Sequence, residues 1–261
     1  MPDYKILPLG AHTIDYLHQG HHKEPLLFLH GYGVGPHAYQ PLLDGLATQY
    51  DVVAPRMYGL NCFTPQPTTL EEYVELTQDF CTALKLPPYH LAGHSMGGGV
   101  GSLLASQSSS TQTVTLLNPL MPVDFGLVGF VWKEFAGLMA SLEREETRRT
   151  LANGRKVLGP LVLNFLKKSR ASLALIRSLS GFTYQERITQ PALLLYGEQD
   201  NWFSLTPSME QAMCTAIPDL TVKRLPDRGH QWPLHYPSQA TEELLAFLTA
   251  KSSGSPSGRL R

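Results

Sequence analysis

Short, almost purely apolar runs recur along the chain, each bounded by glycine, proline or polar residues. Such runs are typical of strands buried on both faces of a parallel sheet. Clear runs lie at residues 26–29, 51–54, 90–92, 114–117 and 192–196, and a weaker one lies at 221–225. Two more short strands are expected at residues 4–9 and 13–17, joined at Gly10. The pattern predicts a sheet built mainly of buried strands.

Segments with helical periodicity lie between these runs. In the clearest, residues 70–86, apolar or small residues recur at spacings of three and four. Thr69 and Glu72 form a capping box, which satisfies free N–H groups of the first turn. Other helices are expected at residues 38–48, 96–106, 206–216 and 237–250. Alternating strands and helices predict an α/β protein, with a mostly parallel central sheet flanked by helices.

One long segment breaks the alternation. Residues 120–183 contain no strand candidate, whereas residues 132–151 and 161–179 have helical patterns. We therefore expect an all-helical insertion at 120–183, within a core made of residues 1–119 and 184–250. The last residues, 251–261, are rich in Ser, Gly and Pro and are expected to be disordered.

Composition narrows the possible partners. Of 261 residues, 43% are hydrophobic, and 21 Lys and Arg against 22 Asp and Glu leave a net charge of −1. This balance argues against nucleic acid and favours a small ligand that is not strongly charged. The sparse cysteines Cys62, Cys81 and Cys214 and the lack of a signal peptide or a membrane-spanning run favour a soluble, cytoplasmic protein without stable membrane insertion. The oligomeric state stays open.

The sequence Gly93-His94-Ser95-Met96-Gly97 matches the pattern G-x-S-x-G. It follows the predicted strand at 90–92 and opens the predicted helix at 96–106, which is the setting that this motif requires. A sharp turn of this kind holds the serine in a strained backbone conformation and pushes its hydroxyl outward. Ser95 is therefore the candidate nucleophile.

A glycine-rich loop, His30-Gly31-Tyr32-Gly33-Val34-Gly35, follows the strand at residues 26–29. Its backbone N–H groups could bind a developing negative charge, and we expect the N–H groups of Tyr32 and Met96 to form an oxyanion hole. A dinucleotide loop is excluded because Pro36 stands where the last glycine of G-x-G-x-x-G would be.

Two further polar residues follow late strands. Asp200 comes after the strand at 192–196, and His230 comes after the strand at 221–225. The order Ser95, Asp200, His230 is that of one hydrolase architecture, in which the histidine is the base and the aspartate orients it. Asp124, after the strand at 114–117, is a second candidate for the acid.

Metal chemistry has little support in the sequence. The histidines near the N-terminus, His12, His18, His21 and His22, lack a ligand spacing such as H-E-x-x-H. No metal ion and no cofactor are therefore expected.

Taken together, the motifs at 30–33, 93–98, 194–200 and 229–230 resemble those of the α/β-hydrolase fold family, over nearly the whole chain. The resemblance implies Ser95 as nucleophile, Asp200 as acid and His230 as base. It also identifies the insertion at 120–183 as the helical cap. One departure is Arg56, where relatives usually have an aspartate.

The expected activity is a serine esterase that cleaves a small hydrophobic ester through an acyl-enzyme. Cleavage of a thioester, lactone or C–C bond, perhydrolysis, acyl transfer, and a non-catalytic ligand receptor remain alternatives. We expect substrate contacts from residues within or beside the motifs, namely His30, Gly31, His94, Trp202 and Trp232.

Overall fold

The computed structural model describes residues 4–57, 66–122, 169–184 and 186–253. In these ranges the strands form one eight-stranded sheet in the order β1-β2-β4-β3-β5-β6-β7-β8. The strands are β1 (Tyr4–Leu9), β2 (His12–Gln19), β3 (Pro25–Leu29), β4 (Asp51–Pro55), β5 (Tyr89–His94), β6 (Thr111–Leu117), β7 (Ala192–Gly197) and β8 (Leu220–Leu225). Each apolar run that predicts a strand is confirmed as one.

The strand directions divide the sheet into two parts. β1 pairs antiparallel with β2, and β2 pairs antiparallel with β4, whereas all the other neighbouring strands are parallel. The parallel strands therefore end at one common edge, and the loops that follow them gather there. β1 and β8 are the two outer strands of the described sheet.

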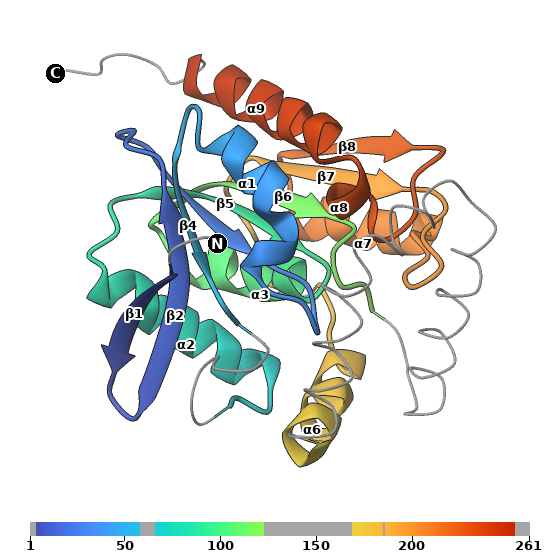
Figure 1. Ribbon diagram of the computed structural model, residues 1–261. Helices are drawn as coiled ribbons and strands as arrows, with labels where there is room; N and C mark the ends of the chain where they lie inside the picture. The colour runs from blue at the N-terminus through green and yellow to red at the C-terminus, as the bar shows by residue number, and fades with distance from the viewer. Residues whose placement is uncertain (1–3, 58–65, 123–168, 185, 254–261) are drawn as a thin grey trace, which may run out of the picture.

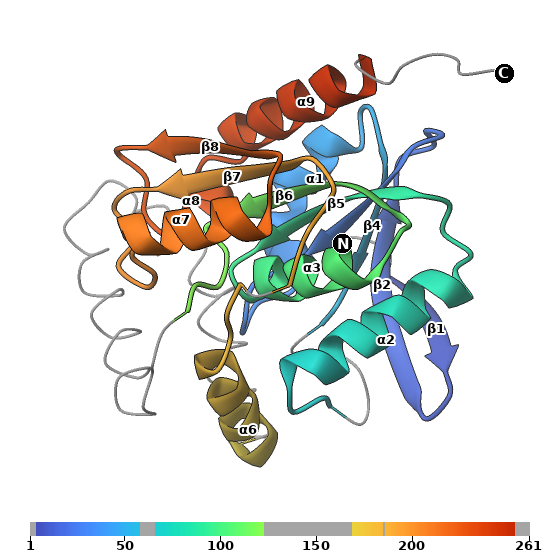
Figure 2. The same cartoon turned by 180° about the vertical axis from the view of Figure 1, so that it is seen from behind.

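Helices cover both faces of the sheet (Figure 1 and Figure 2). They are η1 (Pro36–Tyr39), α1 (Gln40–Leu46), α2 (Leu70–Ala83), α3 (Met96–Gln107), α6 (Ser169–Ser180), α7 (Pro207–Ala216), α8 (Trp232–His235) and α9 (Pro237–Ser253). α1, α8 and α9 pack on one face, and α2, α3 and α7 pack on the other. The predicted mostly parallel α/β sheet with flanking helices is confirmed.

The alternation of side chains along a strand builds two cores. In β3, Leu27 and Leu29 join the core beneath α2 and α3, while Leu26 and Phe28 join the core beneath α1 and α9. All five residues of β3 are buried. A strand of this kind needs apolar residues at every position, which explains why the run shows no alternation in the sequence.

The predicted helix at 38–48 is divided in the structure. A 3₁₀ turn covers Pro36–Tyr39, and the α-helix begins only at Gln40. Pro41 has no N–H to donate to the preceding turn and its ring obstructs the carbonyl four residues earlier. It is therefore accommodated in the first turn of a new helix, where that N–H is not needed.

The end of the chain corrects a second expectation. α9 continues to Ser253, so the first three residues of the tail predicted to be disordered are helical. The Nζ of Lys251 donates to both carboxylate oxygens of Asp219, at 3.1 and 3.0 Å. This ion pair favours helix continuation beyond residue 250. Residues 254–261 lie outside the described ranges.

Only part of the expected insertion is described. α6 confirms helix within the predicted segment at 161–179, and the side chain of Ser178 accepts the Leu70 N–H at the start of α2 (3.0 Å). The predicted helix at 132–151 lies outside the described residues. In the described parts of the chain, no helix combines the length and the hydropathy needed to cross a bilayer.

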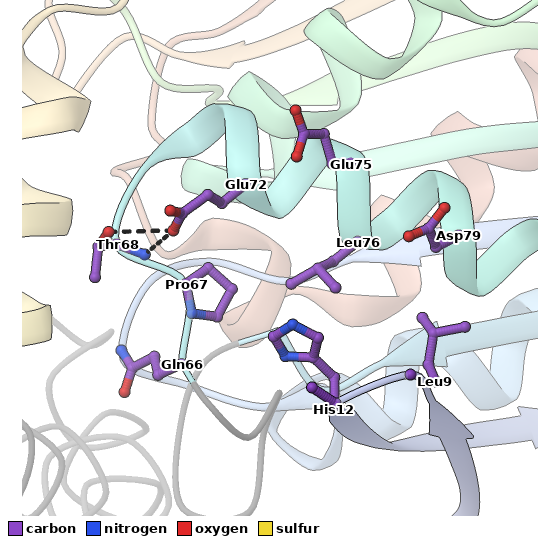
Figure 3. Close-up of a pocket in the computed structure, with 11 residues that line it drawn as sticks. Leu9, His12, Gln66, Pro67, Thr68, Glu72, Glu75, Leu76 and Asp79 are labelled. Atoms are coloured by element: carbon purple, nitrogen blue, oxygen red, sulfur yellow. Dashed lines mark hydrogen bonds between the residues drawn. The ribbon is translucent and has the colours of Figure 1, made fainter.

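The start of α2 has the predicted cap, with one difference. The Thr69 side chain accepts the Glu72 N–H (3.2 Å), as a capping box requires. The Glu72 carboxylate, however, accepts from the N–H and hydroxyl of Thr68, at 2.6 and 3.1 Å, and not from the cap residue itself (Figure 3). The reciprocal bond is therefore shifted one residue toward the N-terminus, and it still satisfies a backbone donor.

We expect Thr69→Ala to lower the free energy of unfolding by about 1 kcal/mol, because the first turn of α2 loses its side-chain acceptor. Thr69→Ser, which keeps the oxygen, is the matched control and should stay close to the wild type. Urea unfolding of the three proteins measures the difference. Equal stability of Thr69→Ala and Thr69→Ser would contradict the assigned cap.

Candidate active site

Ser95 stands alone between the end of β5 and the first residue of α3. Its backbone has φ 55° and ψ −122°, a conformation that residues with a Cβ rarely adopt. Backbone hydrogen bonds hold it: the Ser95 N–H donates to Leu117 O (3.2 Å), and the Ser95 carbonyl accepts from Leu120 N–H (2.8 Å). The strained turn expected from the G-x-S-x-G motif is present.

The two glycines of the motif leave space for this turn. A Cβ on Gly97 would overlap the backbone carbonyl of Leu29, and a Cβ on Gly93 would overlap the carbonyl of Gly97. The backbone of α3's first turn therefore lies very close to the backbones of β3 and β5. A side chain at either glycine would not fit between them.

Ser95, His230 and Asp200 form a continuous hydrogen-bonded row. His230 Nε2 lies 2.9 Å from Ser95 Oγ, and His230 Nδ1 lies 2.8 Å from Asp200 Oδ2. With the imidazole hydrogen on Nδ1, the serine hydroxyl donates to Nε2 and Nδ1–H donates to the carboxylate. The structure thus brings together three residues that are 30 and 135 positions apart in the sequence.

The Asp200 carboxylate has hydrogen-bond donors on both oxygens. Oδ1 accepts the backbone N–H groups of Trp202 (2.7 Å) and Phe203 (3.0 Å), and Oδ2 accepts from Asn118 Nδ2 (2.6 Å) as well as from His230. The side chain has 0% exposure. Burial alone would raise the pKa of Asp200, but the charge of His230 and these donors outweigh burial and lower it. Asp200 is therefore an anion at neutral pH.

Asn118 is a site residue that the sequence analysis did not identify. Besides donating to Asp200, its Oδ1 accepts from the Gly197 N–H (2.9 Å) and from Trp232 Nε1 (2.7 Å). It adopts a positive φ of 37° directly after β6. A polar amide immediately after a buried parallel strand was the available signal.

Trp232 differs from the expected substrate contact. Its side chain is fully buried and belongs to the core beneath α1 and α9. Its indole N–H donates to Asn118 Oδ1, and Asn118 in turn donates to Asp200, so Trp232 supports Asp200 through Asn118. Trp202 is only half-buried, and its ring centroid lies 5.8 Å from that of His230. Of the two tryptophans, Trp202 is the one whose ring lies beside the imidazole of His230.

His30 and His94 are also buried, although substrate contact was expected of both. His30 Nε2 accepts the Met57 N–H (2.7 Å), so its Nδ1–H donates to Gly31 O (2.8 Å). His94 bonds to Tyr39 Oη (2.6 Å) and to His230 O (2.9 Å). Both nitrogens of each ring are occupied within the protein, which gives the two histidines structural positions behind the site.

The loop expected to supply an oxyanion donor lies against Ser95. A Cβ built on Gly31 would be 3.3 Å from Ser95 Cβ, which places this backbone next to the candidate nucleophile. Tyr32 follows in the same loop and is half-buried. Met96 is the first residue of α3, so its N–H is among the donors that have no acceptor within the helix. The two candidate donors thus belong to segments that adjoin Ser95, one in the loop after β3 and one at the start of α3.

Arg56 has a partner that explains its presence. Its guanidinium lies 3.0 Å from Asp15 Oδ2 on β2, and 4.1 Å from the ring centroid of Tyr4 on β1. The side chain therefore ties β4 to the antiparallel strands. The following residues of that loop, 58–65, lie outside the described ranges, as does the alternative acid Asp124.

A groove of about 550 Å³ lies between the β1–β2 hairpin and α2 (Figure 3). It shares no residue with the hydrogen-bonded row of Ser95, His230 and Asp200. No group of three His, Cys, Asp or Glu side chains in the described ranges is arranged to hold a metal ion.

A sequence model of the alpha/beta hydrolase family matches residues 26–245. The chain belongs to the alpha/beta hydrolase family. The match runs from within β3 to within α9 and includes Ser95, Asp200 and His230.

Solved hydrolases have the same fold at low sequence identity. The enol-lactonase from Burkholderia xenovorans LB400 has a TM-score of 0.78 and 18% identity, covering 94% of this chain and 100% of the other. A bacterial membrane phospholipase A has a TM-score of 0.76 and 19% identity, covering 96% and 86%. A thermophilic esterase from Thermogutta terrifontis has a TM-score of 0.70 and 18% identity, covering 95% and 99%.

Curated relatives match over shorter stretches. The chain is 32% identical over 125 residues to the dihydrolipoyllysine-residue acetyltransferase component of the acetoin cleaving system of Cupriavidus necator, covering 47% of this chain. It is 32% identical over 87 residues to the (E)-2-((N-methylformamido)methylene)succinate hydrolase of Acinetobacter baylyi, covering 33% of this chain. In both cases the match spans 33% of the relative's own length.

We expect this protein to lose stability as the pH falls below about 6.5. Burial lowers the pKa of His30 to about 4 and that of His94 to about 3. Between these values and about 6.5, the unfolded chain binds protons that the folded protein does not, so each histidine destabilises the fold by about 1.4 kcal/mol per pH unit lowered. Melting temperatures at pH 7, 6 and 5 measure this decline.

The control uses two single replacements. His94→Gln should make the decline shallower, whereas His21→Gln, at an exposed position, should leave it unchanged. If His94→Gln and the wild type had the same dependence on pH, a neutral, buried His94 would be contradicted.

Proposed function

We propose that this protein is a serine hydrolase that cleaves carboxylic esters through an acyl-enzyme on Ser95. The observation that supports it is the unbroken row Ser95–His230–Asp200, with 2.9 and 2.8 Å between the bonded atoms. A serine hydroxyl is a weak nucleophile unless a base accepts its proton, and such a row supplies that base in the required geometry.

In the first half-reaction, Ser95 Oγ attacks the ester carbonyl while its proton moves to His230 Nε2. The new Oγ–C bond gives a tetrahedral oxyanion. When the oxyanion collapses, the bond from carbon to the alcohol oxygen breaks, and Nε2 returns the proton to the leaving alcohol. Asp200, held as an anion by its donors, stabilises the imidazolium present between the two transfers.

In the second half-reaction, a water molecule takes the place of the alcohol. His230 Nε2 accepts one water proton as the water oxygen attacks the acyl carbon. Collapse of the second tetrahedral species breaks the Oγ–C bond, and the proton returns to Ser95. The carboxylic acid leaves and the starting enzyme is restored.

We assign the oxyanion hole to the backbone N–H groups of Tyr32 and Met96. The position of Met96 at the helix start adds the positive end of the α3 dipole to its free donor. The close approach of Gly31 to Ser95 supports the same location for the Tyr32 N–H. Both donors would act on the oxygen as it becomes charged.

The proposed substrate is a small hydrophobic ester in a cytoplasmic setting. The half-buried Trp202 ring beside His230 supports an apolar group at this position. The known hydrolases of the same fold include an enol-lactonase, a phospholipase and an esterase. Lactone cleavage is therefore the second candidate, because a lactone is an internal ester that the same row would open.

The first experiment measures hydrolysis of p-nitrophenyl esters with acyl chains of increasing length. The wild type should turn over esters and react with a fluorophosphonate, whereas Ser95→Ala should lose turnover by roughly a thousandfold or more and lose labelling. The length profile also tests the hydrophobic substrate. A wild type that neither hydrolyses esters, thioesters or lactones nor becomes labelled would disprove the proposal.

The second experiment decides the acid. Asp200→Asn should lower kcat by roughly a thousandfold, because the amide cannot stabilise the imidazolium. Asp124→Asn is the control, and we expect it to keep nearly full activity. An inactive Asp124→Asn beside an active Asp200→Asn would transfer the role to Asp124.

A further inference from the structure

A buried chain of hydrogen bonds crosses behind the candidate site. The Gly31 N–H donates to Tyr39 Oη (3.2 Å), and Tyr39 Oη lies 2.6 Å from His94 Nδ1. His94 Nε2 lies 2.9 Å from the backbone oxygen of His230. Tyr39 and His94 are each 1% exposed, so no water competes for these groups.

The direction of every bond in this chain is fixed by its two ends. A backbone N–H can only donate, so Tyr39 Oη accepts from Gly31, and the hydrogen of its own hydroxyl is satisfied when His94 Nδ1 accepts it. A backbone carbonyl can only accept, so His94 must carry its hydrogen on Nε2 and donate it to His230. One arrangement satisfies all the groups, and it requires a neutral His94.

Burial keeps both side chains in that state. It raises the pKa of Tyr39, which therefore retains the hydrogen that it donates, and lowers the pKa of His94 to about 3. Neutrality of His94 also matters for its neighbour, because the ring centroids of His94 and His230 lie 5.0 Å apart. A charged His94 would oppose the proton that His230 must accept.

This chain of hydrogen bonds connects three segments of the candidate site. Gly31 belongs to the loop after β3, next to Tyr32 and against Ser95. His94 ends β5 directly before Ser95, and His230 follows β8. The Tyr39 and His94 side chains therefore fix the backbone of the base relative to the backbone of the oxyanion loop.

We propose that Tyr39 and His94 are positioning residues that set the placement of His230 relative to Ser95 and the Gly31–Tyr32 loop. This inference rests on the hydrolase reaction proposed above. The Tyr39 ring already packs on Phe28, with centroids 4.9 Å apart, and a phenylalanine would keep that contact. The hydroxyl alone serves the hydrogen-bond chain.

Tyr39→Phe is therefore the principal variant. It leaves the Gly31 N–H and His94 Nδ1 without their partner, and a small displacement of reacting groups is costly. For a p-nitrophenyl ester we expect kcat to fall by about tenfold to a hundredfold, with KM changed less than about twofold. His94→Leu should lower kcat at least as far, and His94→Gln, which restores a donor for the His230 carbonyl, should recover part of it.

Tyr89→Phe is the matched control. Tyr89 is a buried tyrosine at the opposite end of β5, where its backbone N–H donates to Ser110 O (2.9 Å) and its hydroxyl lies near the polar groups of Ser108 and Thr111, away from the site. It should lose stability as Tyr39→Phe does, with kcat unchanged. A loss of kcat shared equally by both variants would reduce the effect to general destabilisation and overturn the inference.

A spectroscopic measurement separates this inference from the hydrolase proposal. In ¹⁵N-histidine-labelled protein, the proton between His230 Nδ1 and Asp200 should give a downfield NMR signal that Tyr39→Phe shifts and Tyr89→Phe does not. A shifted signal in a protein that hydrolyses no ester would support the coupling and refute the esterase. An unchanged His230 signal in Tyr39→Phe, or an unchanged kcat where the wild type is active, overturns the inference.

Discussion

The site depends on keeping one carboxylate charged without contact to water. Burying an unpaired anion is very costly, so each Asp200 oxygen must find donors within the fold. Oδ2 has His230 and Asn118, and Oδ1 has two backbone N–H groups of its own loop. These donors meet only because three parallel strands end at the same edge of the sheet. The buried charge of Asp200 therefore depends on the parallel arrangement.

Asn118 connects the buried carboxylate of Asp200 to other parts of the fold. Its amide bonds at once to Asp200, to the Gly197 backbone and to the Trp232 indole, so the ends of β6 and β7 and the start of α8 share one side chain. A polar network of this kind is stabilising only while every member has a partner. Because Asp200 bonds in turn to His230 Nδ1, Asn118 acts through Asp200 on the imidazole that faces Ser95.

Much of this structure could be predicted from the sequence, because parallel strands leave unmistakable apolar runs and the polar groups of the row follow them directly. The nucleophile turn was predictable for steric reasons, since only glycine fits at Gly93 and Gly97. The sequence predicts substrate contacts from His30, His94 and Trp232, whereas the structure buries all three side chains. Nearness along the chain indicates which loop a residue occupies, but not which way its side chain points. Tyr39 and Asn118 gave no motif, because their roles arise from contacts across the sheet.

The outer strands of the sheet have a consequence for the behaviour of the protein in a crowded solution. An exposed strand edge invites pairing with another chain and therefore aggregation. β8 carries Lys223 and Arg224, held in ion pairs with Glu243 and Glu210. β1 carries Lys5 and Pro8, and proline cannot donate to an incoming strand. Charge at one edge and a missing donor at the other therefore both oppose the addition of a further strand from a second copy of the chain.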